Sequence, residues 1–471
     1  MKCDSKRLLV VALNYAPEKT GIGKYVGEMT EWLAARDVAV RVVTAPPYYP
    51  EWSVKQGYCA HRYRTEWHAG SKVYRCPVWV PRNPRGMTRL LHLLSFAISS
   101  FPVILWQALA WRPDVIFVVE PPLGAAPGAR LAAKLCGASS WLHVQDLEVD
   151  AAFELGLLRM PLLRRLTLAV ERWLLRGFSH VSNISEAMGM RLEQKGVERQ
   201  RMLFFPNWVD TEMIRPMERQ NALRTELAIE PRTRVVLYSG NMGEKQGLDL
   251  ILQVARRFDN EADVLFLLCG DGAVRERIGR AARGLRNVRL IPLQPLARLN
   301  ELLNLADVHL LPQRTEATDL VLPSKLTAMM ASGRPVVAAA RGGSDVARFA
   351  GKGGLVVAPG DVSAFDRAIR RLLSDGTLSR RLGAAGRACA LHHWERDSVL
   401  RRTFTQLPAF AGLFADAGRD QVAEASVVEE VLSAREAVVH PELASSLALA
   451  KAAANAGAHA ALRQAQRKVA G

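Results

Sequence analysis

The residues best suited to chemistry in this sequence lie in one short segment, Pro323-Ser324-Lys325. An apolar run precedes it, a helical stretch rich in Ala and Met follows it, and a Gly-x-Pro turn then leads into a new apolar strand. A turn between a strand and a helix directs free backbone N–H groups and the positive end of the helix dipole towards one point. Such a point binds phosphate or another anion. Lys325 adds positive charge there, although an ordinary lysine at a helix start is the alternative interpretation.

Three further turns contain glycines that would let a ligand approach the backbone closely. The first turn, residues 14–25, contains Gly21 and Gly23, and the others lie at residues 240–247 and 270–272. The first turn does not match the Gly-x-Gly-x-x-Gly spacing of a dinucleotide site, because Gly27 comes one residue too late. Because both halves of the chain contain a turn suited to binding phosphate, the sequence instead predicts two nucleotide-type domains that face one cleft.

The elements that position these turns alternate between apolar strands and helical stretches, which predicts α/β architecture with parallel, doubly wound sheets. The expected strands are residues 8–13, 38–44, 115–119, 140–144, 180–181, 235–239, 263–268, 288–291, 308–311, 336–339 and 355–357. The expected divisions are an N-terminal Rossmann-like domain over 1–205, a linker over 206–234, a second Rossmann-like domain over 235–390, a helix over 391–412 that returns towards the first domain, and an Ala-rich helical tail over 413–471.

The composition is that of a globular protein with an anionic partner. The 471 residues are 49% hydrophobic and 23% charged, with a formal net charge of +17. Acidic lipid and phosphorylated sugars are candidate partners, whereas no aromatic-basic interleaving indicates nucleic acid. The six cysteines show no Cys-x-x-Cys spacing, so they indicate neither a zinc site nor a redox motif. The first apolar run is too short for a signal peptide, and we expect a cytoplasmic location.

Two segments suggest contact with a membrane. Residues 90–111 are largely apolar but contain several polar residues and Pro102, which predicts a helix, broken at Pro102, that is buried or lies on the bilayer surface rather than crossing it. Residues 155–178 mix leucines with five arginines. That basic amphipathic pattern suits an anionic membrane surface, and a solvated helix face explains it equally well.

Several short motifs occur together in a fixed order and spacing. They occupy residues 15–18, 21–23, 145–150, 182–188, 206–210, 240–248, 270–272 and 322–326. On these motifs, over about residues 6–410, the chain resembles a family 4 glycosyltransferase of the GT-B fold. It resembles most closely the group that includes the colanic acid biosynthesis glycosyltransferase assigned as a fucosyltransferase.

The resemblance implies a transferase that moves a sugar from a nucleotide-sugar donor, held mainly on the second domain, to an acceptor held mainly on the first. It implies retention of the anomeric configuration, and no metal or other cofactor. The sequence contains no Asp-x-Asp motif, in agreement with this expectation. The implied acceptor is a lipid-linked oligosaccharide of bacterial exopolysaccharide assembly, at the cytoplasmic surface of the inner membrane.

The chemistry of glycosyl transfer assigns the donor side. The departing diphosphate gains negative charge, which positive side chains and oriented N–H groups must stabilise if no metal does so. Lys325 is the expected catalytic cation, with Lys245 as a second cation. The expected donor-binding residues are Gly240, Asn241, Gly243, Lys245, Gly270, Asp271, Gly272, Pro323, Ser324, Lys325 and Leu326.

The acceptor side has two expected components. One is the turn at Thr20, Gly21 and Gly23. The other is Asp146, which follows a strand and is expected to act as a base towards the acceptor hydroxyl or to orient it. A helix N-cap is the alternative role for Asp146, and Glu148 and Asp150 are rivals for the catalytic one.

The sequence also departs from the general family pattern. Leu320 and Ala328 stand where many members carry two glutamates that hold the ribose and the sugar, and Asp319 or Glu316 could take part of that role. Two other classes of function therefore stay open. One is a nucleotide-sugar epimerase or sugar-phosphate synthase of the same fold, and the other is a catalytically silent scaffold.

Overall fold

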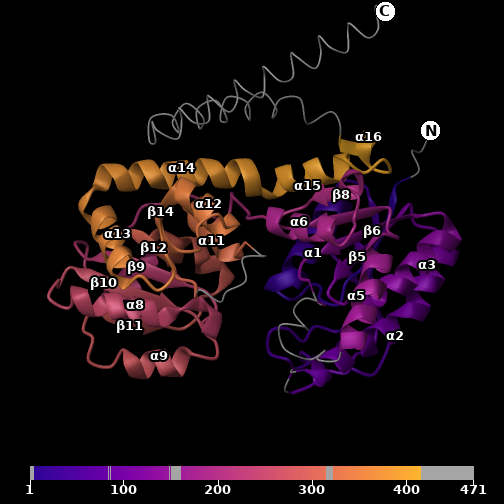
Figure 1. Ribbon diagram of the computed structural model, residues 1–471, viewed down its shortest axis with the longest axis horizontal. Helices are drawn as coiled ribbons and strands as arrows, with labels where there is room; N and C mark the ends of the chain where they lie inside the picture. The colour runs from indigo at the N-terminus through magenta and orange to yellow at the C-terminus, as the bar shows by residue number, and fades with distance from the viewer. Residues whose placement is uncertain are drawn as a thin grey trace, which may run out of the picture. The chain divides into compact units, whose positions relative to one another are not determined.

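The computed structural model describes residues 5–82, 84, 86–147, 149, 161–314 and 322–414 of the chain, with the side chains of 161–164 left out. Two parallel-stranded sheets, each covered by helices, account for most of these residues (Figure 1). The predicted α/β class with two Rossmann-like domains is confirmed. The expected tail over 413–471 lies outside the described residues beyond Phe414.

The first sheet has eight strands within the described residues, in the order β3-β4-β2-β1-β5-β6-β7-β8. The strands are β1 (Arg7–Val11), β2 (Ala39–Thr44), β3 (Arg64–His68), β4 (Ser71–Arg75), β5 (Val115–Glu120), β6 (Ser139–Val144), β7 (His180–Asn183) and β8 (Met202–Phe204). All neighbours pair in parallel except β3 and β4, which form an antiparallel hairpin at one edge. The central strands β1 and β5 are almost entirely buried, as their continuous apolar sequence predicts.

The helices associated with the first sheet are α1 (Gly21–Ala34), α2 (Met87–Trp111), α3 (Ala126–Cys136), α5 (Pro161–Leu175) and α6 (Glu186–Gln194), with short 3₁₀ turns η1 (Leu123–Ala125) and η2 (Arg199–Arg201). The expected break at Pro102 is wrong, because α2 continues through this residue. Pro102 is exposed, so water can satisfy the carbonyl that loses its backbone partner. By length and composition α2 could cross a membrane, although part of its apolar surface is buried.

The second sheet has six parallel strands within the described residues, in the order β11-β10-β9-β12-β13-β14. The strands are β9 (Arg234–Ser239), β10 (Val264–Cys269), β11 (Val288–Ile291), β12 (Val308–Leu311), β13 (Val336–Ala339) and β14 (Gly354–Val357). The helices described in this half of the chain are α7 (Ala222–Glu226), α8 (Leu248–Ala255), α9 (Arg275–Ala281), α10 (Leu299–Asn304), α11 (Ser324–Ala331), α12 (Asp345–Gly353), α13 (Val362–Ser374), α14 (Gly376–Trp394), α15 (Arg396–Thr405) and α16 (Ala411–Phe414), with 3₁₀ turns η3 (Glu244–Gln246), η4 (Arg256–Phe258) and η5 (Leu296–Arg298). Of these, α15 and α16 lie beside the first domain (Figure 1).

The strand order reverses at one point in each sheet. In the first sheet the reversal lies between β1 and β5, and in the second it lies between β9 and β12. Open parallel sheets bind ligands outside the carboxyl ends of the strands at such a switch point. The turn after β1 and the turn after β9 both occupy this position, and the segment after β12 leads to α11. The topology therefore concentrates the predicted anion-binding turns at the two switch points.

The end of the second domain contacts both the linker and the first domain. The backbone N–H of Val209 donates to the carbonyl of Trp394 at 2.8 Å, and Arg396 forms an ion pair with Asp210 at 2.9 Å. In α15, Asp397 accepts hydrogen bonds from the Trp32 indole at 2.6 Å and from Arg36 at 2.7 Å, both on α1. The chain therefore returns to the first domain through paired polar contacts.

Candidate active site

Lys325, the second residue of α11, is the cation at the switch point of the second sheet. Its ammonium donates hydrogen bonds to the Tyr238 hydroxyl at 3.2 Å and to the Gln246 side-chain carbonyl. It also lies 4.7 Å from the centre of the Tyr238 ring. Burial lowers the pKa of Lys325 to about 7. Because no carboxylate among the described residues pairs with it, its charge is available to an anionic ligand.

Tyr238 and Gln246 are the site residues that the sequence did not reveal as partners of Lys325. Tyr238 is fully buried near the end of β9, and its hydroxyl donates to the Asn241 carbonyl at 2.6 Å. That bond directs an oxygen lone pair at Lys325. Gln246 is the last residue of the η3 turn. Lys245 beside it is exposed, and its backbone carbonyl accepts a hydrogen bond from the N–H of Arg314 at 3.3 Å. One signal was present in the sequence: a tyrosine inside an otherwise apolar buried strand needs a polar partner.

The two glycine turns after β9 and β10 are packed directly against each other. The N–H of Met242 donates to the Asp271 carbonyl at 2.8 Å. A Cβ atom at Gly270 would lie 2.0 Å from the Gly240 carbonyl oxygen, and one at Gly272 would lie 2.6 Å from the Asn241 side chain. The Asp271 carboxylate accepts from the N–H of Gly272 at 2.7 Å. These glycines are therefore required by close packing at this end of the sheet.

The predicted donor-binding residues at the start of α11 fall into two groups, those that hold the helix in place and those that are accessible to a ligand. Pro323 caps the helix, and its carbonyl accepts the N–H of Leu326 at 2.9 Å. The Leu326 side chain is fully buried in the core of the second domain. Ser324 is exposed and Lys325 is half-buried, so these two residues carry the groups best placed to meet a ligand. Gly243 lies close to Asn241 in the same turn: a Cβ atom added at Gly243 would lie 3.4 Å from the side-chain nitrogen of Asn241.

The turn after β1 is organised by a buried glutamate. Glu18 accepts backbone hydrogen bonds from Tyr48 and Tyr49, each at 2.9 Å, and another from the Asn14 side chain at 3.0 Å. Burial raises the pKa of Glu18. A Cβ atom at Gly23 would lie 2.7 Å from this carboxylate. Glu18 and Gly23 together shape the loop that leaves Thr20 and Gly21 accessible at the start of α1.

Tyr25 connects this loop to α11. Burial raises the pKa of the Tyr25 hydroxyl, and its hydrogen-bonding contact with Ser324 acts in the opposite direction. The Tyr25 ring meets Trp208 edge-on at 5.2 Å, and the Trp208 indole donates to Glu28 at 2.7 Å. The predicted acceptor-side turn and the predicted donor-side helix are therefore brought together, with the 206–210 segment beside them.

Asp146 is half-buried, two residues after the end of β6. The residue before it is held by a chain of polar contacts: the Gln145 amide nitrogen lies 2.9 Å from His143 Nε2 and 3.1 Å from the Asn207 side-chain oxygen. Since that amide can only donate, His143 Nε2 accepts and its Nδ1 donates to Ser182 at 2.8 Å.

Burial lowers the pKa of His143 to about 3, which keeps the ring neutral and lets it fill this accepting role. Gln145 is thereby fixed between β6 and the 206–210 segment, and the position of Asp146 follows from it. Four other residues from the sequence predictions, Glu148, Asp150, Glu316 and Asp319, lie outside the described residues, as does Leu320. Ala328 is half-buried on α11.

Comparison with known protein families matches both halves of the chain. Residues 20–208 match the glycosyl transferase 4-like domain, and residues 233–375 match the glycosyl transferases group 1 domain. The chain is 42% identical over 407 residues to WcaI of Escherichia coli (strain K12), a glycosyl transferase assigned to colanic acid biosynthesis. That alignment covers 84% of this chain and 98% of WcaI. A second relative, the sulfoquinovosyl transferase SQD2 of Arabidopsis thaliana, is 28% identical over 68% of this chain and 59% of its own length.

Solved structures show the same fold at low sequence identity. Sucrose-phosphate synthase from Thermosynechococcus elongatus superposes with a TM-score of 0.64 at 18% identity, covering 84% of this chain and 97% of that one. Anabaena HepE in complex with UDP and glucose superposes with a TM-score of 0.60 at 15% identity, covering 84% and 98%. The fold is GT-B. The chain belongs to the glycosyltransferases that join a glycosyl transferase 4-like domain to a group 1 domain.

Proposed function

We propose that this glycosyltransferase transfers a sugar, with retention of anomeric configuration, from a nucleotide-sugar donor to a lipid-linked oligosaccharide in the assembly of a colanic-acid-like exopolysaccharide. The single observation that carries the donor side is Lys325, an unpaired ammonium at the switch point of the second sheet, beside the start of α11. The relationship to WcaI supports the pathway, and the lipid-linked acceptor is our inference from that pathway.

The proposed chemistry uses the groups of the second domain to stabilise the leaving group. As the glycosidic bond to the donor phosphate lengthens, negative charge accumulates on the diphosphate. Lys325 and the free N–H groups of Ser324 and Lys325 face that charge from one side, and the turn containing Gly240, Asn241 and Gly243 faces it from the other. In this mechanism no metal ion is required. Because the configuration is retained, the acceptor hydroxyl attacks from the face that the diphosphate leaves, and Asp146 orients this hydroxyl and removes its proton as the new bond forms.

The proposed setting is the cytoplasmic surface of the inner membrane, where a lipid-linked acceptor would be presented. The apolar helix α2 and the arginine-bearing helix α5 support this location. HepE, which shares the fold, was solved with UDP and glucose, so UDP-sugars belong in the first test, and GDP-fucose belongs there because of the colanic acid relationship.

A thermal-shift panel tests the donor side. Purified protein is heated with UDP-, GDP-, ADP- and dTDP-sugars, because a ligand that binds only the native state raises the unfolding temperature. One nucleotide class should give a clear shift. Transfer of the selected radiolabelled sugar to a membrane-extracted lipid fraction, with and without EDTA, then tests the acceptor and the metal-free mechanism.

Two results would contradict the proposal. Release of free sugar, or of a soluble product without any acceptor, would favour an epimerase or a synthase. Donor binding without turnover on any lipid fraction would favour a silent scaffold.

A further inference from the structure

Helix α5 presents two different exposed stripes beside its buried face. Arg165 and Arg172 on the helix and Arg176, the residue directly after it, follow one another at intervals of seven and four residues and are exposed. Leu166, Val170 and Trp173 form the adjacent stripe, also at helical spacing, with 60%, 52% and 62% of each side chain exposed. A basic stripe beside an exposed apolar stripe is the pattern of a helix that lies in a membrane interface.

The buried face of α5 anchors the helix firmly. Leu174 and Leu175 are almost fully buried in the core of the first domain, and the Glu171 carboxylate pairs with Lys195 at 2.6 Å in a buried ion pair. Because the helix is fixed on this side, its two exposed stripes are held in a constant orientation.

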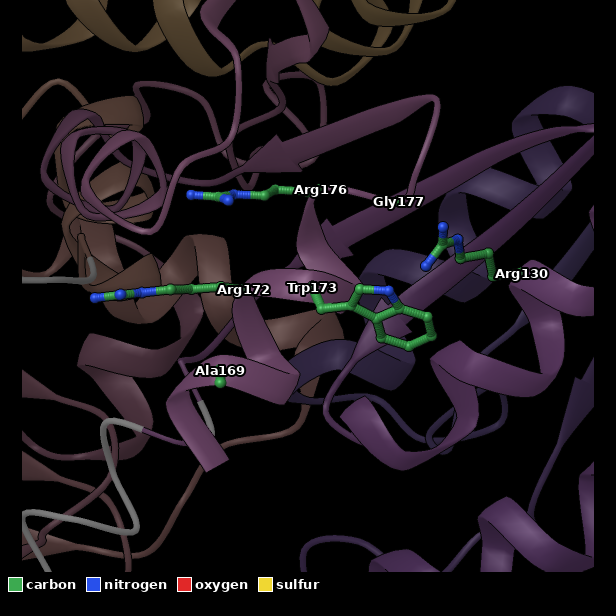
Figure 2. A pocket seen from close by; sticks show the side chains of 6 residues that line it. All are labelled: Arg130, Ala169, Arg172, Trp173, Arg176 and Gly177. Atoms are coloured by element: carbon green, nitrogen blue, oxygen red, sulfur yellow. The ribbon is translucent and has the colours of Figure 1, made fainter. Parts of the chain in front are cut away.

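A hollow of about 440 Å³ lies where α5 meets α3, and arginines surround it. Figure 2 shows Arg172 of α5 and Arg176, just after this helix, extending in one direction, while Arg130 lies on the other side with its guanidinium turned towards the Trp173 indole. The Arg130 guanidinium carbon lies 4.8 Å from the centre of that ring. Among the described residues, none of these three arginines forms an ion pair. One nitrogen of Arg130, Nη1, is buried without a hydrogen-bond partner.

Two glycines create the space that the guanidinium groups occupy. A Cβ atom at Gly177 would lie 1.9 Å from the Arg130 guanidinium carbon, and one at Gly196 would lie 2.2 Å from Arg176 Nη2. The chain therefore seats both guanidinium groups against its backbone. Arg176 stays exposed, whereas Arg130 is half-buried. Removing a guanidinium from water without an acceptor is unfavourable, so the arrangement suits an anion such as phosphate, which arginine binds in bidentate fashion.

Exposed apolar side chains extend this basic hollow over the neighbouring helices. On α2, Met87, Leu91, Leu94, Ile98, Phe101 and Leu109 share one exposed stripe at helical spacing. On α3, Leu131 and Leu135 are exposed as well. The ring of Phe101 packs against Gly128 of α3, where a Cβ atom would lie 2.6 Å from it, and the helices α2 and α3 lie side by side (Figure 1). Large exposed apolar surfaces of this kind mark sites of contact with a membrane or another protein.

The charge of this surface distinguishes between those two partners. The described residues of α2, α3 and α5 include a single acidic residue, Glu171, and it is buried in its pair with Lys195. Glu198 lines the adjoining hollow beside Arg176, but the exposed charges described on the three helices themselves are all positive. An apolar surface that carries such charges is complementary to an anionic bilayer. A second copy of this chain would instead bring its own arginines against these, which is unfavourable.

We propose that the exposed side chains of α2, α3 and α5, together with Arg130, Arg172 and Arg176, form a docking face for an anionic phospholipid bilayer, with lipid phosphates bound by the arginines that line the hollow at Trp173. The inference rests on the proposed function for its biological setting. The binding itself is independent of sugar transfer, so the two can fail separately.

Vesicle flotation tests the docking face directly. The full chain is mixed with vesicles of phosphatidylcholine alone, or with about one third phosphatidylglycerol, at low and physiological salt. We expect the protein to float with the anionic vesicles, and to do so less as salt increases. The double variant R172A/R176A should lower the partition coefficient about thirtyfold, because each cation near an anionic surface contributes about 1 kcal/mol and 1.4 kcal/mol is a tenfold step.

Matched variants separate the docking face from net charge and from hydrophobicity. R380A/R381A removes two exposed arginines from α14, outside the proposed docking face. Because the attraction of a charge to the bilayer falls off with distance from its surface, this variant should float within about twofold of the wild type. L94S/I98S should weaken flotation, whereas L293S/L296S, which changes two exposed leucines of the second domain, should not. Thermal unfolding of each variant reports whether it is folded.

The outcomes are distinct. Absence of wild-type flotation with anionic vesicles at physiological salt overturns the proposal, and so does an equal effect of the R172A/R176A and R380A/R381A pairs. Loss of a dimer in light scattering on L94S/I98S, without any lipid binding, would assign the face to self-association. If the nucleotide-sugar shift persists while flotation fails, the proposed function stands without this docking face. If flotation persists without any nucleotide-sugar shift, the docking face stands and the donor assignment fails.

Discussion

Lys325 and Tyr238 lie on different elements, 87 positions apart in the sequence, and their side chains meet at 3.2 Å. The Tyr238 hydroxyl donates its hydrogen bond to the Asn241 carbonyl, so it accepts the hydrogen bond from the Lys325 ammonium through an oxygen lone pair. Both side-chain partners of Lys325, Tyr238 and Gln246, are neutral and cannot compensate its charge. An incoming diphosphate would supply the missing negative charge, which makes this pair the centre of the proposed donor site.

Replacing Lys325 with alanine should lower turnover of the donor sugar by a factor of about 10² to 10³, the usual cost of losing one group that stabilises developing negative charge. The unfolding temperature should stay the same or rise, because a half-buried, unpaired ammonium opposes folding. Steady-state kinetics with the donor identified by thermal shift, together with a melting curve, measure both effects.

Lys245→Ala is the matched control, since it removes a lysine that is exposed and makes no side-chain contact with Lys325. A loss confined to Lys325→Ala would identify Lys325 as the main cation. Equal losses in both variants would support the predicted role of Lys245 as a second cation. Nearly normal turnover in Lys325→Ala would disprove the leaving-group assignment.

Donor affinity should depend on pH in a defined direction. The pKa of Lys325 in the free protein is about 7, so below pH 7 the side chain is mostly charged and above pH 7 it must take up a proton to bind a diphosphate. Binding of the nucleoside diphosphate should therefore weaken about tenfold for each pH unit between 7 and 9, where the charge of the phosphate itself is nearly constant. Calorimetric titration over this range, in buffers of different ionisation enthalpy, would also detect the proton uptake.

Lys325→Arg provides the contrast, because arginine keeps its charge throughout this range. Its profile should be flat between pH 7 and 9 even if its affinity is lower. A wild-type profile that is equally flat would show that Lys325 does not titrate near neutrality.

Sequence patterns predicted the layers of this fold well because burial dictates them. The apolar runs that make up most of β1 and β5 could be recognised directly. The hairpin of β3 and β4 was missed, because β3 lies at the edge of the sheet and its residues RTEWH are mostly polar and exposed. The break expected at Pro102 was wrong for a related reason: a proline on the exposed side of a helix leaves its unpaired carbonyl in water.

The candidate site was predictable only in part. Lys325 and the glycines could be found from local patterns of turn and helix. The contacts of Lys325 with Tyr238 and Gln246 depend on β12 lying next to β9, and this strand order is a property of the whole sheet. The hydrogen bonds from Gln145 to His143 and from His143 to Ser182 likewise connect β6 and β7, and no local sequence pattern predicts them.

Asp146→Asn separates the two roles considered for Asp146. Asparagine caps a helix as well as aspartate does, so a purely structural role predicts unchanged activity and stability. If Asp146 accepts the proton of the acceptor hydroxyl, kcat should fall by about 10² to 10⁴, while the thermal shift with the donor stays the same. Initial rates with saturating donor and a melting curve for each protein distinguish the two cases.

Gly270→Ala should destabilise the second domain strongly. A Cβ atom at this position would lie 2.0 Å from the Gly240 carbonyl oxygen, where the backbone φ is +158°, so the two turns would have to separate. We expect a loss of about 3 kcal/mol or more in the free energy of unfolding, the range of severe overpacking, together with loss of donor binding. Gly284→Ala is the control, because Gly284 also has positive φ, +92°, but nothing lies within 4 Å of the added atom. That variant should lose only about 1 kcal/mol from backbone strain. Denaturant unfolding of both variants gives the comparison, and similar losses would mean that the Gly240 and Gly270 turns are not in close contact in solution.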